Sequence, residues 1–512
     1  MELMHQYHPS LSFARGYLIT PSAQSPALPL LASWNQHRVG AHSVRTHPDT
    51  DTHFHTSERG DAWVLIGHAY DPWAGIPDED NILRRLAAAL EEGDFRFLKE
   101  LDRLSGRFVL FFFRSDGTGM AVQDAVGLKN LFFAEGPHGP CFASHSQLLA
   151  DVLALPRDPE IDRLVGSFFY GIGIRHLPGL STPFLGMRML SANTRLELPT
   201  LELQRFFPRE SHPESDDLGH TARIIGDVFT ASFKMLSRKK PLALSLSMGT
   251  DSRVSLAASR AFRDQIHYFS YNSDAAEEKD AVGAHELCRR LGIDHTIYRV
   301  PAAATNPTEE THLSAVLDHN AAYVRNPKPS ERAKLSHLLA ELPPGRMEVK
   351  TPVSEIGRAI YCKKMGVKKL PARLTPRHMS NLYKRNLFER GLLKFMDRAF
   401  AEYIRTTRFG EDFFNYEQAD MFYWEHRNSA WASLANQDHD ILHDMTVIFN
   451  NRDVLKWLLS PSRPDRIADH LHQEIIRYLW PEALQMPLSA MDTPKKKLRK
   501  LAERTFFAVN RF

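Results

Sequence analysis

A short run of small polar residues lies near the middle of the chain, between two apolar segments. The run Ser247–Ser252, SMGTDS, follows the apolar stretch Leu242–Leu246 and precedes another, Val254–Ala258. The first stretch is short enough for a buried strand and the second suits a helix, so the spacing predicts a strand, a turn and a helix. Backbone N–H groups at such a turn and at the helix N-terminus can bind a phosphate group.

The side chains of this run offer two further kinds of contact. Ser247 and Ser252 can donate hydroxyl hydrogen bonds to an anion. Asp251 repels phosphate, so we expect it to hold a metal ion that binds the phosphate in turn. An ordinary strand-to-helix turn capped by Ser or Asp has the same spacing and remains an alternative.

The run resembles the Ser-Gly-Gly-x-Asp-Ser pyrophosphate loop of the ATP pyrophosphatases. More narrowly, it resembles the synthetase half of the class B asparagine synthetases and their relatives. Met248 stands where the family has its first Gly, a residue that gives the backbone conformational freedom and close access to phosphate. The resemblance implies that ATP and its pyrophosphate are bound by Leu246, Ser247, Gly249, Thr250, Asp251, Ser252 and Ser270.

A second motif follows about a hundred residues later. The stretch Val349–Tyr361, VKTPVSEIGRAIY, resembles the family's Gly-rich turn, which continues with Asp-Glu and a Tyr and meets ATP phosphate and metal. Glu355 matches the Glu, and Ser354 stands where the family has Asp. We therefore expect Asp251 and Glu355 to bind Mg²⁺ and Glu355 to take part in catalysis. A helix start capped by Ser354 is compatible with this expectation.

A basic stretch, Lys495–Lys497, lies near the end of the chain. Family members carry a lysine near the C-terminus that reaches the reacting carbonyl and phosphate, where a cation offsets developing negative charge. We take Lys496, the central one, as the candidate catalytic lysine, although the choice among the three is open. A solvated basic tail is an equally compatible reading of this stretch.

The first part of the chain reads as strand-rich, with the buried-strand candidates Trp63–Gly67 and Phe108–Phe113. Asp124–Phe133, followed by Cys141–Ser144, resembles the end of the glutamine-amidotransferase domain of the class B asparagine synthetases. Thr182–Leu190 resembles the segment that closes that domain.

That family's glutaminase nucleophile is a cysteine made N-terminal by removal of the initiator Met. Here position 2 is Glu2, and the first cysteine is Cys141. A carboxylate is a far poorer nucleophile toward an amide than a thiolate. We predict that this domain does not hydrolyse glutamine and is retained as a scaffold.

The order of elements predicts the domain organisation. Residues 1–205 form an amidotransferase-like αββα sandwich, residues 206–220 form a polar linker, and residues 221–512 form the synthetase domain. Ile266–Tyr271, Asp274–Leu291 and Thr296–Val300 read as strand, helix and strand, which predicts a parallel sheet. The fold class is therefore α/β, with an ATP-pyrophosphatase-type domain (adenine nucleotide α-hydrolase-like) that carries a helical extension over 370–480.

The composition limits the partners and the cellular location that we expect for this protein. The net charge of +3 and the absence of a long basic block argue against a nucleic-acid partner, and no apolar run is long enough to span a membrane. Three cysteines and no signal peptide favour a reduced, cytoplasmic location. The polar histidine-rich stretch 42–55 could hold a metal through His53 and His55, but a solvated loop is the favoured interpretation.

The resemblance implies ATP-dependent amide formation through an acyl-adenylate, with release of AMP and pyrophosphate. The substrate would be a small molecule or peptide that carries a carboxylate and an amine. We expect intramolecular cyclisation, as in the lasso-peptide cyclases and β-lactam synthetases of antibiotic biosynthesis, with a precursor peptide and its processing protease as partners. An ammonia-using asparagine synthetase and a non-catalytic nucleotide- or protein-binding homologue remain alternatives.

Overall fold

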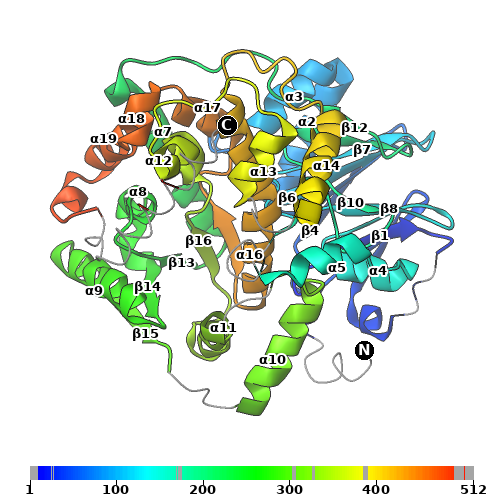
Figure 1. The fold of residues 1–512 in the computed structure, drawn as a ribbon, viewed down its shortest axis with the longest axis horizontal. Helices are drawn as coiled ribbons and strands as arrows, with labels where there is room; N and C mark the ends of the chain where they lie inside the picture. Colours follow the sequence, from blue (N-terminus) through cyan, green and yellow to red (C-terminus); the bar gives the residue numbers. More distant parts are fainter. Residues whose placement is uncertain are drawn as a thin grey trace.

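A computed structural model describes residues 10–488 apart from 25, 27, 169, 171–175, 302–306, 326–328 and 385–389, together with 501 and 505. Its strands form two antiparallel six-stranded sheets and one parallel five-stranded sheet (Figure 1). This mixed α/β architecture confirms the fold class expected from the sequence.

The two antiparallel sheets use the first 205 residues. The first has the order β10-β8-β9-β1-β3-β2 and the second β12-β11-β7-β6-β5-β4. Their strands are β1 (Tyr17–Pro21), β2 (Asn35–Val39), β3 (His42–Thr46), β4 (Thr52–Thr56), β5 (Ala62–Tyr70), β6 (Ser105–Phe113), β7 (Gly119–Gln123), β8 (Phe132–Gly136), β9 (Gly139–Ala143), β10 (Met187–Met189), β11 (Thr194–Leu198) and β12 (Leu203–Arg205).

Alternation along β6 explains why these sheets stack. Val109 and Phe111 point into a core shared with Tyr17 of the first sheet, whereas Phe108 and Leu110 pack on the opposite face. That face is covered by α2 (Glu79–Glu92) and α3 (Asp94–Asp102), and α4 (Ser146–Leu153) packs against β8 and β9 of the first sheet. The result is an αββα sandwich. Successive side chains of a strand point to opposite faces, so both faces of β6 are buried.

The parallel sheet has the order β15-β14-β13-β16-β17. Its strands are β13 (Leu242–Ser245), β14 (Ile266–Asn272), β15 (His295–Arg299), β16 (Met347–Lys350) and β17 (Asp444–Val447). After β13 the chain adds strands on one side and then returns to the other side at β16. The gap between β13 and β16 is therefore the topological switch point, where open parallel sheets bind ligands beyond the carboxyl ends of their strands.

Helices connect and flank these strands. Those up to β16 are α5 (Pro159–Val165), α7 (Leu218–Lys239), α8 (Thr250–Ala258), α9 (Ala275–Arg290), α10 (Pro307–Asn320) and α11 (Pro329–Glu341). Those after β16 are α12 (Ile360–Met365), α13 (Pro376–Lys384), α14 (Arg390–Thr407), α15 (Gln418–Phe422), α16 (Ser433–Gln437), α17 (Arg452–Leu459), α18 (Arg463–Ile467) and α19 (His470–Leu479). Short helical turns are η1 (Pro29–Ser33), η2 (Arg260–Gln265), η3 (Ser354–Arg358), η5 (Asp438–Ile441) and η6 (Pro481–Leu484), and η4 (Tyr423–Ala432) is a π-helical stretch.

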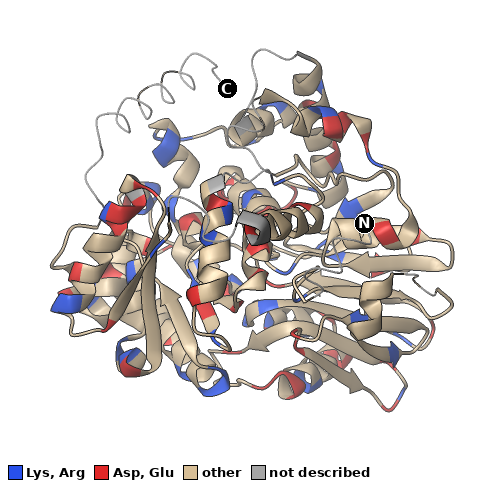
Figure 2. Ribbon diagram, turned by 90° about the horizontal axis from the view of Figure 1, so that it is seen from below, with Lys and Arg blue, Asp and Glu red and all other residues tan. Residues whose placement is uncertain are grey.

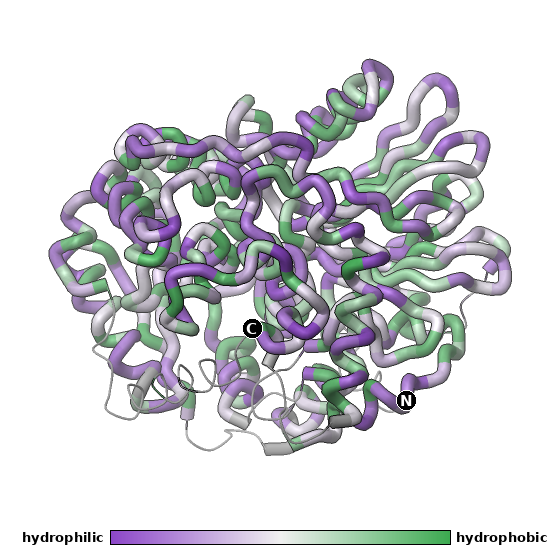
Figure 3. The backbone as a smooth tube through the Cα atoms, turned by 45° about the horizontal axis from the view of Figure 1, so that its top comes forward, coloured by the Kyte–Doolittle hydropathy of each residue, from purple (hydrophilic) through white to green (hydrophobic). Residues whose placement is uncertain are grey.

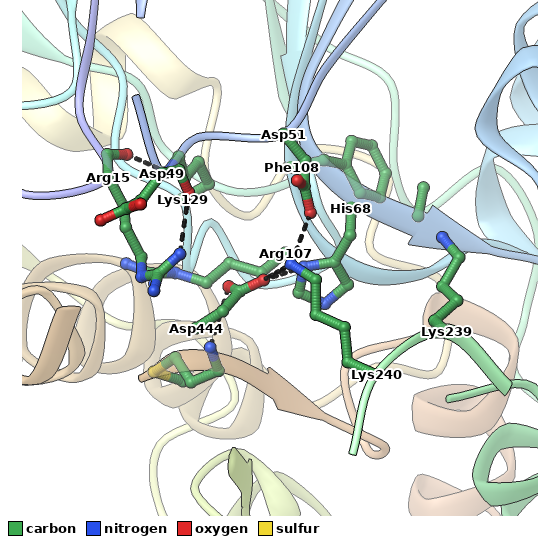
Figure 4. A network of polar contacts seen from close by, with 12 residues as sticks. Arg15, Asp49, Asp51, His68, Arg107, Phe108, Lys129, Lys239, Lys240 and Asp444 are labelled. Carbon is green, nitrogen blue, oxygen red and sulfur yellow. Dashed lines mark hydrogen bonds and ion pairs between the residues drawn. The ribbon is translucent and has the colours of Figure 1, made fainter. Parts of the chain in front are cut away.

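Polar and charged contacts join the antiparallel sheets to the parallel one. Arg107 of β6 forms a buried ion pair with Asp440 of η5, close to the start of β17. Asp444 at the start of β17 lies within 3.8 Å of His68 and 3.2 Å of Lys240 (Figure 4). Burial opposes ionisation of Asp444, but the neighbouring cations hold its pKa below the ordinary value. The two parts therefore share a polar, charge-matched junction rather than a purely apolar one.

The surface carries both signs of charge. Lys and Arg are interspersed with Asp and Glu around the ribbon (Figure 2), as expected from the near balance of the composition. Apolar segments gather in the strands and inner helices, whereas the loops at the edge are hydrophilic (Figure 3). Within the described residues, no helix combines the length and the apolar character that crossing a bilayer requires. The predicted boundary at 205 coincides with the end of β12, the one at 221 lies in the first turn of α7, and the division into domains stays a prediction.

Candidate functional site

The predicted pyrophosphate loop lies at the switch point of the parallel sheet. It connects β13 to α8, so Asp251 stands beyond the carboxyl end of β13, while Ser354 and Glu355 follow β16 on the adjacent side. The two motifs, about a hundred residues apart in sequence, are thereby brought to one edge of the sheet.

Hydrogen bonds between residues of the loop fix its backbone conformation. The Gly249 N–H donates to Ser247 Oγ at 3.2 Å, and Ser252 Oγ donates to the Ser247 carbonyl at 3.0 Å. Gly249 caps α8 with extended backbone angles, φ −69° and ψ 158°, and the helix begins at Thr250. The first N–H groups of a helix have no acceptor within it, and the helix dipole adds positive charge there, so this end can receive an anion.

Met248, which replaces the family's first Gly, turns away from the phosphate-facing side. Its side chain is buried against Gly283 of α9, where a Cβ would lie 1.8 Å from the Met248 Sδ. Met248 is also absent from the described residues with positive φ, so its backbone does not require glycine. The absence of a side chain at position 283 thus leaves room for Met248 beside α9.

Ser270 lies beneath the loop and is 2% exposed. Its hydroxyl donates to the Leu246 carbonyl at 2.8 Å and contacts His295 Nε2 at 3.0 Å. Burial, together with the charge of His285, lowers the pKa of His295 to about 4, so this histidine is neutral at pH 7. In this arrangement Ser270 supports the strand end from which the loop starts, and its binding to ATP stays a prediction.

Asp251 is held by a guanidinium group. Arg358 Nη1 donates to both Asp251 carboxylate oxygens, at 2.8 and 2.7 Å, and the Ser354 hydroxyl donates to Oδ1 at 2.5 Å. His472 of α19 contacts Ser354 Oγ at 3.0 Å through Nε2. Because the serine proton points to Asp251, the neutral histidine ring must donate its Nε2–H to Ser354. Burial, followed by the charge of Arg358, lowers the pKa of His472 to about 3, which keeps it neutral.

Arg358 bridges two carboxylates. Its Nε and Nη2 atoms donate to the two oxygens of Asp469 at 2.8 Å each, and Lys363 Nζ lies 2.6 Å from the same carboxylate. Burial alone would lower the pKa of Arg358, but hydrogen bonds to Asp469 and the charge of Asp251 raise it above the ordinary value. Arg358 is thus a permanently charged group at the switch point, and its side chain is 13% exposed.

Glu355 faces a different partner from Asp251. Its carboxylate accepts a short hydrogen bond from the Tyr423 hydroxyl, at the start of the π-helical stretch η4. Burial and the nearby charge of Glu355 raise the pKa of Tyr423 well above its ordinary value, so the phenol stays protonated and donates. π-helical stretches occur often at functional sites. The neighbouring aromatic residues Phe422 and Trp424 are buried in the core.

The residues present do not fit a protein-held Mg²⁺ in this arrangement. Asp251 and Glu355, the expected metal pair, engage Arg358 and Tyr423 instead of facing one another. Ser354 supplies a neutral hydroxyl where the family's motif has a carboxylate. In the part of the chain that the structure describes, no group of three or more His, Cys, Asp or Glu residues is placed to hold a metal ion. This holds for the stretch around His53 and His55 as well.

A buried arginine next to the loop was not found by sequence reasoning. Arg253 of α8 donates to the carbonyls of Met486 at 2.6 Å, Pro487 at 2.7 Å and Ala483 at 3.1 Å. It thereby fastens the segment that precedes the three lysines to the pyrophosphate loop. Lys495, Lys496 and Lys497 themselves lie outside the described residues.

Arg253, Arg358, Asp469 and Tyr423 are the site residues that the sequence did not single out. Arg358 stands inside the second motif, three residues after Glu355, and Arg253 directly follows Ser252 of the loop, so the charge of each was the available signal. Asp469 and Tyr423 come from segments in which we identified no catalytic or binding motif.

One comparison with known proteins covers the part of the chain that holds the loop. Residues 225–325, which include β13, the loop, β14 and β15, match the family model described as asparagine synthase. The comparison with curated proteins finds no match.

Two solved structures are similar at low identity. One is glutamine phosphoribosylpyrophosphate amidotransferase from B. subtilis complexed with ADP and GMP, with 12% identity, a TM-score of 0.23 and coverage of 52% of this chain and 61% of that chain. The other is described as the allosteric regulatory enzyme of purine biosynthesis, with 11% identity, a TM-score of 0.24 and coverage of 61% of this chain and 76% of that chain. Residues 225–325, which hold the loop and three strands of the parallel sheet, are thus the part of the chain that is similar to the asparagine synthase family.

Proposed function

We propose that this protein is an ATP-dependent ligase that forms an amide bond through an acyl-adenylate. The observation that carries the proposal is the pyrophosphate-type loop at the switch point of a parallel sheet, within the segment that matches the asparagine synthase family. That family supports an ATP-dependent, amide-forming ligase with a nucleotide site.

The proposed reaction has two steps. A substrate carboxylate oxygen attacks the α-phosphorus of ATP, and the bond to the β-phosphate oxygen breaks, so that pyrophosphate leaves and an acyl-adenylate forms. An amine then attacks the acyl carbon, AMP leaves, and the amine loses one proton. The N–H groups at the start of α8 and the hydroxyl of Ser247 would stabilise the charge on the leaving pyrophosphate.

Glu355 and Tyr423 are the candidate groups for the second step. A carboxylate hydrogen-bonded to a phenol at the sheet edge can accept the proton that the attacking amine releases. Lys496 stays the candidate cation for the reacting carbonyl. Mg²⁺ would accompany ATP on its phosphate oxygens, as Mg²⁺ commonly does.

We further propose that the amine belongs to the substrate itself. All three cysteines, Cys141, Cys288 and Cys362, are buried, and burial raises the thiol pKa to about 12 for the first two and about 11 for the third. None of them can supply a reactive thiolate for glutamine hydrolysis. An amine held on the acyl substrate reacts at high effective molarity, which favours cyclisation of a peptide or natural-product precursor. A precursor peptide and its processing protease would then be the partners, in the cytoplasm.

One observation favours a second candidate function. The bidentate pairing of Asp251 with Arg358 and the loss of a carboxylate at Ser354 are also what a nucleotide-binding homologue without catalysis would tolerate. This alternative predicts nucleotide binding with no turnover.

The test is to incubate the purified chain with ATP and candidate substrates and to follow AMP and pyrophosphate together with product mass. Linear peptides that carry a carboxylate and a free amine should give a product lighter by one water, with one AMP per product. If the best reaction is formation of asparagine from aspartate and ammonia, the proposed cyclisation is contradicted and the proposed ligase activity still stands. Binding of ATP without AMP release for any substrate would overturn the ligase in favour of the non-catalytic homologue.

A further inference from the structure

The charge arrangement at the switch point departs from a metal-binding one most clearly at Arg358. Arg358 places its guanidinium between the carboxylates of Asp251 and Asp469. A divalent cation that bridged Asp251 to a phosphate would need the same Asp251 oxygens. The arginine and such a cation therefore exclude one another, both by space and by like charge.

The hydrogen bonds of Arg358 leave N–H donors for a further acceptor. A guanidinium has five N–H donors in a fixed fork. Nε and Nη2 each donate once to Asp469, and the two close oxygens of Asp251 share one N–H of Nη1, so one N–H on Nη1 and one on Nη2 are left by these contacts. The side chain is 13% exposed and so is not sealed from solvent, and in the inferred complex a phosphate oxygen would accept from one of these donors.

The residues around Arg358 hold it in place. Lys363 shares the Asp469 carboxylate, and the Ser354 hydroxyl, itself held by His472, donates to Asp251. Two carboxylates and two cations thus balance within this cluster. An uncharged residue at 354 removes the negative charge that a second metal ligand would bring.

We propose that Arg358 is a resident cation that takes the place of a protein-bound metal ion at the pyrophosphate loop. The inference rests on the proposed function, because it concerns the same nucleotide site. It states that the chain binds the polyphosphate of ATP without a metal ion coordinated by Asp251, and that affinity depends little on free Mg²⁺. Arg358 is a positioning and charge-supplying residue in this account.

The experiment measures binding of a non-hydrolysable ATP analogue by calorimetry, with Mg²⁺ and with EDTA. For the wild type, the dissociation constants in the two conditions should differ by less than about tenfold. Arg358→Gln should weaken binding in EDTA by more than about tenfold, and Arg358→Lys should fall between, because an ammonium keeps the charge but cannot form the fork. Arg477→Gln, which breaks an exposed ion pair with Glu474, is the matched control and should bind as the wild type does.

A double variant separates the charge of Arg358 from its structural role. Ser354→Asp combined with Arg358→Gln restores a carboxylate and removes the resident cation, so its binding should require Mg²⁺. Dependence of the wild type on Mg²⁺ by more than about a hundredfold would overturn the inference and leave the proposed function standing. Absence of binding with and without Mg²⁺ would overturn both. Equal binding in EDTA by the wild type and a folded Arg358→Gln would also overturn the inference.

Discussion

At the scale of single residues, the contact between Met248 and Gly283 decides whether the loop is open to phosphate. A thioether in a small-residue loop would obstruct an anion if it pointed outward. The absence of a side chain at position 283 gives it an inward place between the loop and α9. The place of the Met248 side chain therefore depends on the glycine at position 283.

Gly283→Ala should push the Met248 side chain out of this place. The added Cβ would lie 1.8 Å from Sδ and 2.5 Å from Cγ of Met248, so the side chain must move as a whole. We expect a loss of about 1–3 kcal/mol in unfolding free energy, the range for overpacking, and weaker ATP binding measured by calorimetry.

The matched variant for this prediction is Met248→Ala combined with Gly283→Ala. It removes the overlap and should restore binding, which appears as an interaction energy in a double-mutant cycle. Additive losses in the two single variants would show that the contact does not govern access to the loop.

The residues of the site differ in how far sequence could predict them. The loop and the second motif were evident because each is contiguous, and the alternation of strand, helix and strand over 266–300 predicted the parallel sheet. The pairing of Asp251 with Arg358 spans 107 positions and depends on the order of β13 and β16, which no local pattern contains. In this arrangement the two residues of the expected metal pair have other partners, Arg358 for Asp251 and Tyr423 for Glu355, and their binding of Mg²⁺ stays a prediction.

At the scale of elements, Arg253 connects α8 to the end of the described chain. Its guanidinium is buried and binds only carbonyl oxygens, and burial lowers its pKa to about 10, so it stays charged at pH 7. Arg253 thus supplies hydrogen-bond donors to backbone carbonyls in and after η6 and so links this segment to α8.

Arg253→Met should release this segment while keeping an apolar side chain of similar length. Loss of three charge-assisted hydrogen bonds near 483–487 should lower the unfolding free energy by about 2–4 kcal/mol. Limited proteolysis should show faster cleavage after α19 than in the wild type. Unchanged cleavage and stability would show that the segment is held by other contacts.

The elements themselves were largely predictable, with one exception of interest. Long periodic helices such as α7 and apolar strands such as β6 have strong local signals. β17 was missed because four residues, Asp444–Val447, lie in an otherwise helical region and begin with a charged side chain. That strand forms only because β16 offers an edge and β6 packs beside it, so its signal is tertiary.

At the scale of the whole molecule, the ion pair between Arg107 and Asp440 couples the antiparallel and parallel sheets. Both side chains are almost fully buried, so removal of one partner leaves a buried charge. Asp440→Asn should lower the unfolding free energy by about 3–5 kcal/mol. In denaturant titrations, fluorescence and circular dichroism should show that the two parts unfold together in the wild type and separately in the variant. Coincident transitions in both proteins would contradict a coupling role for this pair.

Buried neutral histidines should make stability depend on pH. Burial lowers the pKa of His68 to about 4, whereas an unfolded chain takes up the same proton near 6.5. Between these values the unfolded state binds more protons, so stability is complete above pH 6.5 and falls as the pH drops toward 4. The loss at pH 5 should be about 1–2 kcal/mol for this histidine.

The check is chemical denaturation at pH 7 and pH 5. His68→Gln should reduce the difference between the two pH values, whereas the exposed control His138→Gln should leave it unchanged. A pH dependence that is the same in wild type and His68→Gln would assign the effect to other groups.

The central claim, that the loop before α8 binds the phosphates of ATP, is tested most directly by thermal unfolding with and without Mg-ATP. Gly249 is the residue to change, because its φ of −69° suits any residue and a Cβ there meets only Ser247 Oγ, at 3.2 Å. Gly249→Asp and Gly249→Asn should both cap the helix, but only Asp puts a negative charge where the phosphate binds. ATP at about 100 times its Kd should stabilise the wild type by about 2.7 kcal/mol, the Asn variant less, and the Asp variant not at all. No stabilisation of the wild type at millimolar ATP, or an equal shift in the Asp variant, would contradict the account.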